Sequence, residues 1–233
     1  MKCSGGIFLS RSVVLVVCVL FSLSATRAQG VQVAEEKDGY TQSIAKRVEK
    51  IVSALQSTDS VLNSKLRNII IDQYYNLGIT HDARNSQIGA IKDQNRDLTE
   101  DEKDHIRRIE ASTQQQLEQL HKQFLARLAE LCTPHQIEQI KDGMTYGVEQ
   151  VTWKAYQDML PDLTSEQKKQ ILAWLIEARE LAMDAESSEK KHAVFGKYKG
   201  RINNYLSAAG IDMKKAEADW QKRIKERTAA DQK

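Results

Sequence analysis

The stretch Leu66–Arg84, "LRNIIIDQYYNLGITHDAR", decides the fold that this sequence predicts. Its apolar residues recur every three or four positions, as on the buried face of an α-helix. This stripe consists of Leu62, Leu66, Ile70, Tyr74, Leu77, Ile88 and Ile91. A second stripe with the same spacing consists of Ile106, Ile109, Leu117, Leu120, Phe124, Leu128 and Leu131. We therefore expect two long helices, at about 60–95 and 100–131, and their short connection "NRDLT" predicts an antiparallel hairpin.

A threonine begins each of three predicted helices. Each is followed three residues later by Glu or Gln, which is the spacing of a capping box. In that motif the threonine oxygen accepts from a free backbone N–H of the first turn, and the Glu or Gln accepts from the N–H of the threonine. The three pairs are Thr99 with Glu102, Thr133 with Gln136, and Thr164 with Gln167. Pro134 agrees with a helix start there, because the first helical position needs no N–H donor.

Shorter helical segments account for most of the remaining chain, which contains two prolines. We expect helices near 40–56, from Thr133 with a break at "DGMTYG" (142–147), at 165–186, at 189–209 and at 213–228. The apolar stripe of 165–186 consists of Ile171, Leu172, Leu175, Ala178, Leu181 and Ala182. Gly210 suits a helix end. The predicted fold is all-α, with the long-helix hairpin packed against shorter C-terminal helices in one bundle-like domain over 40–228 and a disordered tail at 229–233.

The N-terminus has the pattern of a secretory signal peptide. Lys2 and Arg11 give it a positive start, residues 13–23 are apolar, and Thr26 and Ala28 are small residues before a cleavage point. We expect cleavage after Ala28, a flexible arm at 29–39, and a periplasmic or secreted protein. The apolar run is shorter than the roughly 20 residues that span a bilayer. No integral membrane segment is therefore expected after cleavage.

Cleavage would also change the charge and the cysteine count. It would remove three basic residues and no acidic ones, so the formal net charge would change from +2 to −1. A near-neutral chain lacks the positive field that nucleic-acid binding needs, so we expect no nucleic-acid partner. Cys3 and Cys18 would leave as well, so Cys132 would have no partner within the mature chain for a disulfide.

Short strings of this sequence resemble two known families. The Leu-Thr-x-x-Gln start at Leu163–Gln167 is similar to the signature of the periplasmic envelope-stress chaperones, which implies a concave cradle and a dimer. The segments "YYNLGITHDAR", "IKDGMTYG", "ILAWLIEARELAMDA" and "KHAVFGKYKGRINNYLSAAG" resemble an uncharacterised exported family of Bacteroidota, known as a domain of unknown function. The second resemblance implies an envelope protein of bacteria that live on complex polysaccharides. It carries over no catalytic residue.

A polar interruption of the first long stripe is one candidate site. Continuing the spacing from Leu77 places His81 and Arg84 on the buried face, with Asp82 beside them. Folding the hairpin back predicts that Arg84 pairs with Glu110 and that His81 faces Thr113 or a water molecule. Buried charges need partners, so this layer could fix the register of the helices. Alternatively, His81, Asp82 and Arg84 form a cleft wall that binds a polar or anionic ligand.

The segment "KHAVFGKYKGRINNY" (191–205) is the second candidate. Gly196 and Gly200 are four residues apart, which either allows a neighbouring helix to pack closely or leaves room for a ligand. In the ligand interpretation, tyrosines stack on a sugar ring and polar side chains bind its hydroxyls or a carboxylate. The proposed ligand-binding residues here are His192, Tyr198, Lys199, Arg201, Asn203 and Asn204, and Tyr146 in the "DGMTYG" break joins them.

No sequence motif indicates a particular reaction. The sequence has no metal-ligand spacing, no phosphate-binding loop and no serine nucleophile motif, so we expect no cofactor and no metal. The predicted function is a helical binding or interaction protein whose ligand is a carbohydrate, a protein or a peptide. The alternatives are a glycan-processing enzyme with a site near His81 and Lys199–Tyr205, and a chaperone-like envelope-stress protein. The sequence leaves the oligomeric state open.

Overall fold

The computed structural model describes residues 41–93 and 96–231. The chain divides into two units, one ending at Arg47 and the other running from Val48 to Lys233. In the first unit, residues 41–47 are helical. The predicted signal peptide, the predicted arm at 29–39 and Asn95 of the hairpin turn lie outside the described residues.

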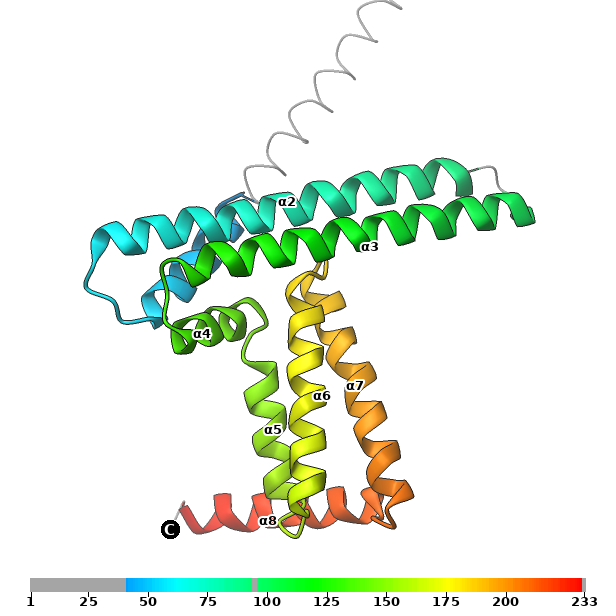
Figure 1. Cartoon of the computed structure of the whole chain (residues 1–233). Coiled ribbons are helices and arrows are strands. Elements are labelled where there is room, and N and C mark those ends of the chain that lie inside the picture. The colour runs from blue at the N-terminus through cyan, green and yellow to red at the C-terminus, as the bar shows by residue number, and fades with distance from the viewer. Residues whose placement is uncertain (1–40, 94–95, 232–233) are drawn as a thin grey trace, which may run out of the picture. The chain divides into compact units, whose positions relative to one another are not determined.

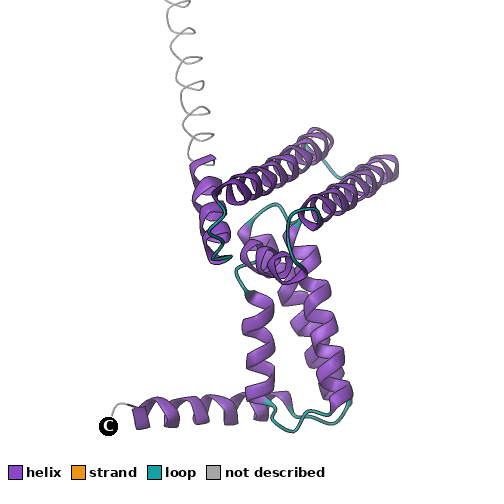
Figure 2. Ribbon diagram, turned by 60° about the vertical axis from the view of Figure 1, so that its left-hand side comes forward, coloured by secondary structure: helices purple, strands orange, loops and turns teal. Residues whose placement is uncertain are grey.

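All regular structure described in the second unit is helical, which confirms the predicted all-α class (Figures 1 and 2). Residues 48–54 are helical, as predicted for the segment near 40–56. The later helices are α2 (Ser60–Lys92), α3 (Glu100–Ala129), α4 (Pro134–Met144), α5 (Val148–Met159), α6 (Ser165–Met183), α7 (Ser188–Ala208) and α8 (Met213–Asp231). No described helix combines the length and apolar character needed to cross a membrane.

Helices α2 and α3 lie side by side, as the predicted hairpin requires (Figure 1). The predicted stripes are largely buried between them and their neighbours, from Leu66 to Leu77 on α2 and from Ile106 to Leu128 on α3. Asp72 and Arg127 add an ion pair of 2.9 Å between the two helices. The three-four spacing of apolar residues therefore gave the correct phase for both helices.

The three predicted capping boxes are all present, at the starts of α3, α4 and α6. In each, the Glu or Gln oxygen accepts from the threonine N–H at 2.9 Å. At α3, Arg96 also contacts the Glu102 carboxylate, and together with the Thr99 donors it lowers the pKa of that carboxyl to about 2. Local sequence alone therefore determines where these helices begin.

Two glycines allow turns that other residues adopt only with strain. Gly147 has a φ of 65° and ends the break between α4 and α5. Gly210 has a φ of 88° just after α7, where its N–H donates to the Ser207 carbonyl at 3.0 Å. The next N–H, of Ile211, donates to Leu206 at 3.1 Å, which completes a Schellman motif. The predicted helix end at Gly210 is confirmed.

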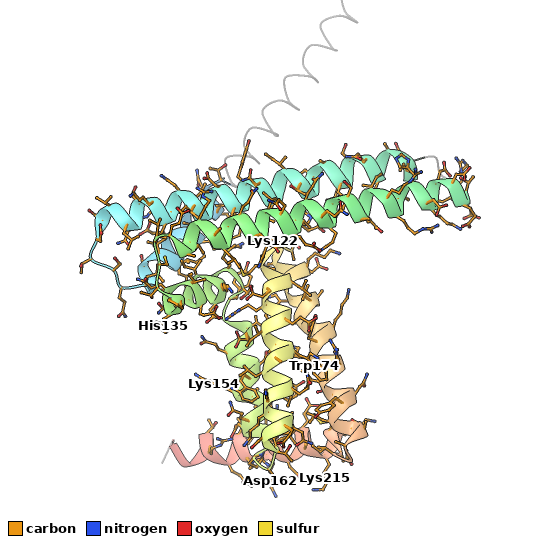
Figure 3. The ribbon with its side chains drawn as sticks, in the orientation of Figure 1. Lys122, His135, Lys154, Asp162, Trp174 and Lys215 are labelled. Carbon is orange, nitrogen blue, oxygen red and sulfur yellow. The ribbon has the colours of Figure 1, made fainter. Side chains whose placement is uncertain are left out.

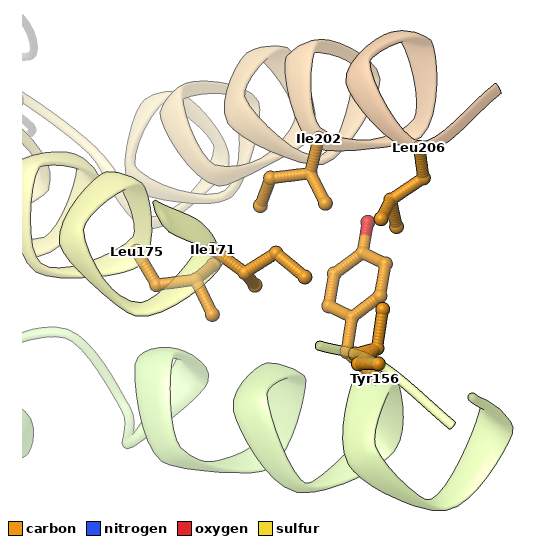
Figure 4. Packing of buried hydrophobic residues seen from close by; sticks show 6 residues of the cluster. Tyr156, Ile171, Leu175, Ile202 and Leu206 are labelled. Carbon is orange, nitrogen blue, oxygen red and sulfur yellow. The ribbon is translucent and has the colours of Figure 1, made fainter. Parts of the chain in front are cut away.

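Helices α5, α6 and α7 share an apolar core (Figure 4). Its buried members are Tyr156, Leu163, Ile171, Leu175, Ile202 and Leu206. A smaller cluster nearer the other end of α6 and α7 joins Ala178 and Ala182 to Phe195. Helix α8 contacts α5 and α7, and over residues 213–229, where its side chains are described, none is buried. It is thus the most weakly packed helix of the unit.

Candidate functional site

A groove of about 630 Å³ lies between α5, α7 and α8. This volume falls within the range of ligand sites in proteins, roughly 300–1,000 Å³. Its walls contain both apolar and polar residues. The lining residues are Val151, Thr152, Ala155, Tyr156 and Met159 from α5, Gly196, Lys199, Gly200 and Asn203 from α7, and Met213, Lys214, Glu217 and Trp220 from α8.

The α7 side of the groove is formed in part by two glycines. A Cβ atom placed on Gly196 or Gly200 would meet no atom of the described residues within 4 Å. The predicted role of these glycines in close helix packing is therefore wrong. Because no neighbouring helix approaches them closely, the absence of side chains leaves space in the groove instead. Their predicted role in leaving room for a ligand stays a prediction.

A buried tyrosine fixes the orientation of Asn203 in the groove. The Tyr156 hydroxyl donates to Asn203 Oδ1 at 2.7 Å. Burial raises the pKa of Tyr156 to about 12, so the hydroxyl keeps its proton at neutral pH. Because Oδ1 accepts from Tyr156, the Asn203 amide has its N–H donors available in the groove.

One carboxylate holds α8 against the end of α5. Asp158 accepts from Trp220 Nε1 at 2.6 Å and from Arg227 at 2.7 Å, and these two groups lower the pKa of its carboxyl. Arg223 donates to the carbonyls of Asp158 and Met159, at 2.9 and 3.1 Å. The last carbonyls of a helix need partners from outside it, and Arg223 supplies them here. These contacts position Trp220 as part of the groove wall.

The structure separates the predicted binding residues of α7. Lys199 and Asn203 line the groove, whereas Tyr198, Arg201 and Asn204 do not. Burial and a hydrogen bond with Glu177 of α6 raise the pKa of Tyr198 to about 12. The Arg201 guanidinium lies 4.4 Å from the ring centre of Trp174, which Figure 3 labels on α6. Asn204 is exposed.

Tyr146 and His192 are brought together, but away from the groove lining. Their rings stack at 5.7 Å between centroids with an interplanar angle of 12°. Tyr146 has a φ of 60° in the break after α4, and its side chain is 41% exposed. The stack therefore links this break to the first turns of α7.

The prediction that His81 points inward is confirmed, whereas Arg84 is only half-buried, and the predicted partners Thr113 and Glu110 are wrong. His81 is 5% exposed, and its Nε2 lies 2.7 Å from the carbonyl oxygen of Asp184. Arg84 pairs with Glu186 and with Asn85, not with Glu110. Asp184 and Glu186 follow α6, an element that a hairpin considered alone does not place.

Two other residues belong to this predicted layer. Thr113 donates to the Ile109 carbonyl within its own helix at 2.8 Å, so it does not need His81 as a partner. Asp82 is exposed. Neither His81 nor Arg84 lines the groove. The structure thus places the two candidate sites of the sequence in different parts of the second unit.

A buried ion-pair network was missed by the sequence patterns. Arg179 on α6 is 3% exposed and contacts Asp142 at 2.9 Å, Glu149 at 2.7 Å and also Glu138. Burial alone would lower the pKa of Arg179, but the carboxylates outweigh it and raise it. The apolar stripe could have predicted that Arg179 is buried, because Arg179 lies four residues after Leu175 and therefore on the same face of the helix. Leu181, which the stripe predicted on the buried side, is 47% exposed.

The network continues toward α3 through Glu180. Its carboxylate lies 3.1 Å from Lys141 and 3.3 Å from His121. Burial raises the pKa of Glu180, but these cations more than offset burial and lower it to about 2. Asp184 and Glu180 together raise the pKa of His121 to about 9. Groups held charged across the neutral range suit structural ion pairs better than proton transfer.

Residues 41–93 and 96–231 contain no cluster of three His, Cys, Asp or Glu side chains that could hold a metal ion. A comparison with curated proteins finds no match to the chain. The predicted Bacteroidota origin and the chaperone resemblance stay predictions. Residues 41–226 match a family described as a protein of unknown function (DUF3826), and the chain belongs to that family.

Proposed function

We propose that this protein is exported by its N-terminal signal and binds a saccharide, without turnover, in the groove between α5, α7 and α8. The lining supports this ligand class because it combines Trp220 and two methionines with oriented polar groups such as Asn203. A sugar ring has apolar C–H faces and a rim of hydroxyls. Sites for small ligands combine apolar walls with a few placed polar groups in the same way.

The single observation that carries the proposal is the open space at Gly196 and Gly200. A glycine inside a helix costs about 1 kcal/mol relative to alanine. At Gly143 packing explains the residue, because a Cβ there would lie 2.7 Å from Ile51 Cγ1. Among the described parts of the chain, no such neighbour lies at Gly196 or Gly200. Two unfavourable residues with no packing role, both lining one groove, support selection for space in which a ligand lies.

The groove supports binding more than hydrolysis. Most glycoside hydrolases place two carboxyl groups on either side of the scissile bond. Among the described residues that line this groove, Glu217 is the sole carboxylate. The enzyme alternative needed His81 and the 199–205 segment in one pocket. His81 instead contacts the Asp184 carbonyl and is absent from the groove lining.

Substitutions at one glycine test the proposal. Gly200→Trp should fill the groove and weaken saccharide binding at least about tenfold, a loss of about 1.4 kcal/mol. Gly200→Ala should bind close to the unchanged protein and raise the thermal midpoint, because alanine favours the helix. The measurements are a saccharide panel followed by calorimetric titration of the mature protein, with chromatography of the ligand afterwards.

Gly89→Trp provides a matched control, since a Cβ added to Gly89 on α2 would also meet no atom within 4 Å, and Gly89 does not line the groove. This variant should bind normally. Equal binding by Gly200→Trp and the unchanged protein would overturn the proposed site. Absence of binding across the panel would overturn the ligand class, and product formation would overturn binding without turnover.

A chaperone-like function is the second candidate, and one observation favours it. Three large apolar side chains on α2, one turn apart, are exposed: Ile71 by 38%, Tyr75 by 64% and Ile79 by 50%. Such a stripe could contact an unfolded client. Suppression of client aggregation at stoichiometric protein, lost when all three residues are changed to serine, would support this function. No suppression by the unchanged protein would dismiss it.

A further inference from the structure

We infer that the saccharide bound in the groove carries an anionic group, a carboxylate or a sulfate, which Lys199 and Lys214 contact. This inference rests on the proposed function and specifies its ligand. Lys199 projects from α7 and Lys214 from α8, and both line the groove. Two ammonium groups on different helices of one groove would bind the same negative group from two sides.

Neither lysine has an ion partner in the part of the chain that the structure describes. Several neighbouring cations differ, because carboxylates neutralise them at the surface. Arg201 lies 3.7 Å from Glu177, Lys215 lies 2.9 Å from Asp219, and Arg227 lies 2.7 Å from Asp158. The two lysines that line the groove therefore both lack a carboxylate partner among the described residues and are available to a ligand. Glu217 is three residues after Lys214, yet no ion pair joins them in the structure.

The hydrogen-bonding character of the groove points the same way. Tyr156 occupies the acceptor oxygen of Asn203, so this amide adds N–H donors to those of the two lysines. Glu217 is the single carboxylate among the described lining residues. The lining thus carries two positive charges against one negative charge and is rich in donors. A neutral sugar leaves the two ammonium groups without a counter-charge, whereas a carboxylate or sulfate supplies one. Such an anion would also make the bond from the neutral Asn203 amide charge-assisted, and such bonds are about twice as strong as neutral ones.

The experiment compares ligands that differ in charge alone. The probes are a short uronic-acid oligosaccharide, its methyl ester, and a sulfated oligosaccharide with its desulfated form. We expect at least one anionic form to bind about tenfold more tightly than its neutral counterpart, with the difference decreasing as salt rises. The form that shows this preference identifies the group as carboxylate or sulfate. Calorimetric titration of the mature protein measures each affinity.

Charge-removing variants locate the contact. Lys199→Met and Lys214→Met should each reduce the preference for the anion several-fold, and the double variant should remove it. Lys197→Met and Lys225→Met are matched controls, because they remove the same charge from α7 and α8 at positions that do not line the groove. Both controls should keep the preference. An equal loss in the controls would show a general effect of charge and would overturn the inference.

The failure of this inference is distinguishable from failure of the proposed function. If neutral and anionic forms bind equally, and Gly200→Trp abolishes the binding of both, the groove binds saccharides but the anionic ligand is wrong. If no form binds, both the proposed function and this inference are wrong.

Discussion

Nδ1 of His121 on α3 lies 2.8 Å from Oδ2 of Asp184, the residue that directly follows α6. His81 of α2 reaches the carbonyl of the same aspartate. Lys191 donates to the Ala182 and Met183 carbonyls at 2.8 and 2.7 Å. Cations and donors are favourable at a helix C-terminus, where the carbonyls are free and the dipole is negative. This end of α6 is thereby attached to the α2–α3 hairpin.

The His121 ion pair predicts a loss of stability at alkaline pH. The pKa of His121 is about 9 in the folded protein and about 6.5 in an unfolded chain. Its contribution is therefore complete below about pH 6.5 and is lost as the pH rises toward 9. We expect the free energy of unfolding to fall by about 1–2 kcal/mol over this window, less than the full pKa difference implies, because water screens the partly exposed pair.

Urea titrations on either side of this window measure that decrease. His121→Gln should show a much smaller decrease, whereas His135→Gln, at an exposed position on α4, should keep it. An unchanged decrease in His121→Gln would assign the pH dependence to another group.

Removing Arg179 should destabilise the protein strongly. Arg179→Met would leave Asp142 and Glu149, whose side chains are 14% and 10% exposed, without their cation. Unpaired buried charges of this kind cost about 3–5 kcal/mol. Burial already raises the pKa of Glu149 despite Arg179, so part of the loss should recover as the pH falls and this carboxyl takes up a proton. Chemical denaturation at neutral and mildly acidic pH measures both effects.

The stability of Arg179→Met is compared with that of a triple variant, which carries Asp142→Asn and Glu149→Gln in addition to Arg179→Met. It removes the charges that Arg179→Met leaves unpaired, so it should be more stable than the single variant. A single variant that loses less than about 1 kcal/mol would show that the network contributes little to stability.

Two glycine-to-alanine changes should have opposite signs. In Gly143→Ala the new Cβ would lie 2.7 Å from Ile51 Cγ1, and Ile51 is only 3% exposed, so it has little room to move. Overpacking of this kind costs about 1–3 kcal/mol. In Gly89→Ala the new methyl meets no atom of the described residues within 4 Å, so the helix should gain up to about 1 kcal/mol. Thermal unfolding measures both, and a stabilised Gly143→Ala would disprove the close contact.

The Asp158 contacts predict that α8 can be destabilised without destabilising α6 and α7. Asp158→Ala removes the acceptor of Trp220 and Arg227. We expect amide hydrogen exchange in residues 213–231 to accelerate about tenfold, while exchange in α6 and α7 stays unchanged. Asp162→Ala is the control, because Asp162 is exposed in the connection after α5 and makes neither of these contacts (Figure 3). Acceleration throughout the chain would show global rather than local loosening.

The sequence by itself determined the helices and the phase of their buried faces. A capping box joins residues three positions apart, and an apolar stripe repeats every three or four, so both are complete within one or two turns of chain. This is why the starts at Thr99, Thr133 and Thr164 and the burial of His81 were predictable. The Schellman end at Gly210 is local in the same sense.

Only the tertiary structure decided which side chains meet. His81 and Asp184 are separated by 103 positions, and Tyr156 and Asn203 by 47, so no local spacing relates them. Whether Gly196 and Gly200 pack against a helix or leave a groove depends on how closely other helices approach that side of α7. Such long-range contacts depend on which apolar faces of the helices pack together. Hydrophobic burial is not directional, so many pairings of helices satisfy the same sequence pattern.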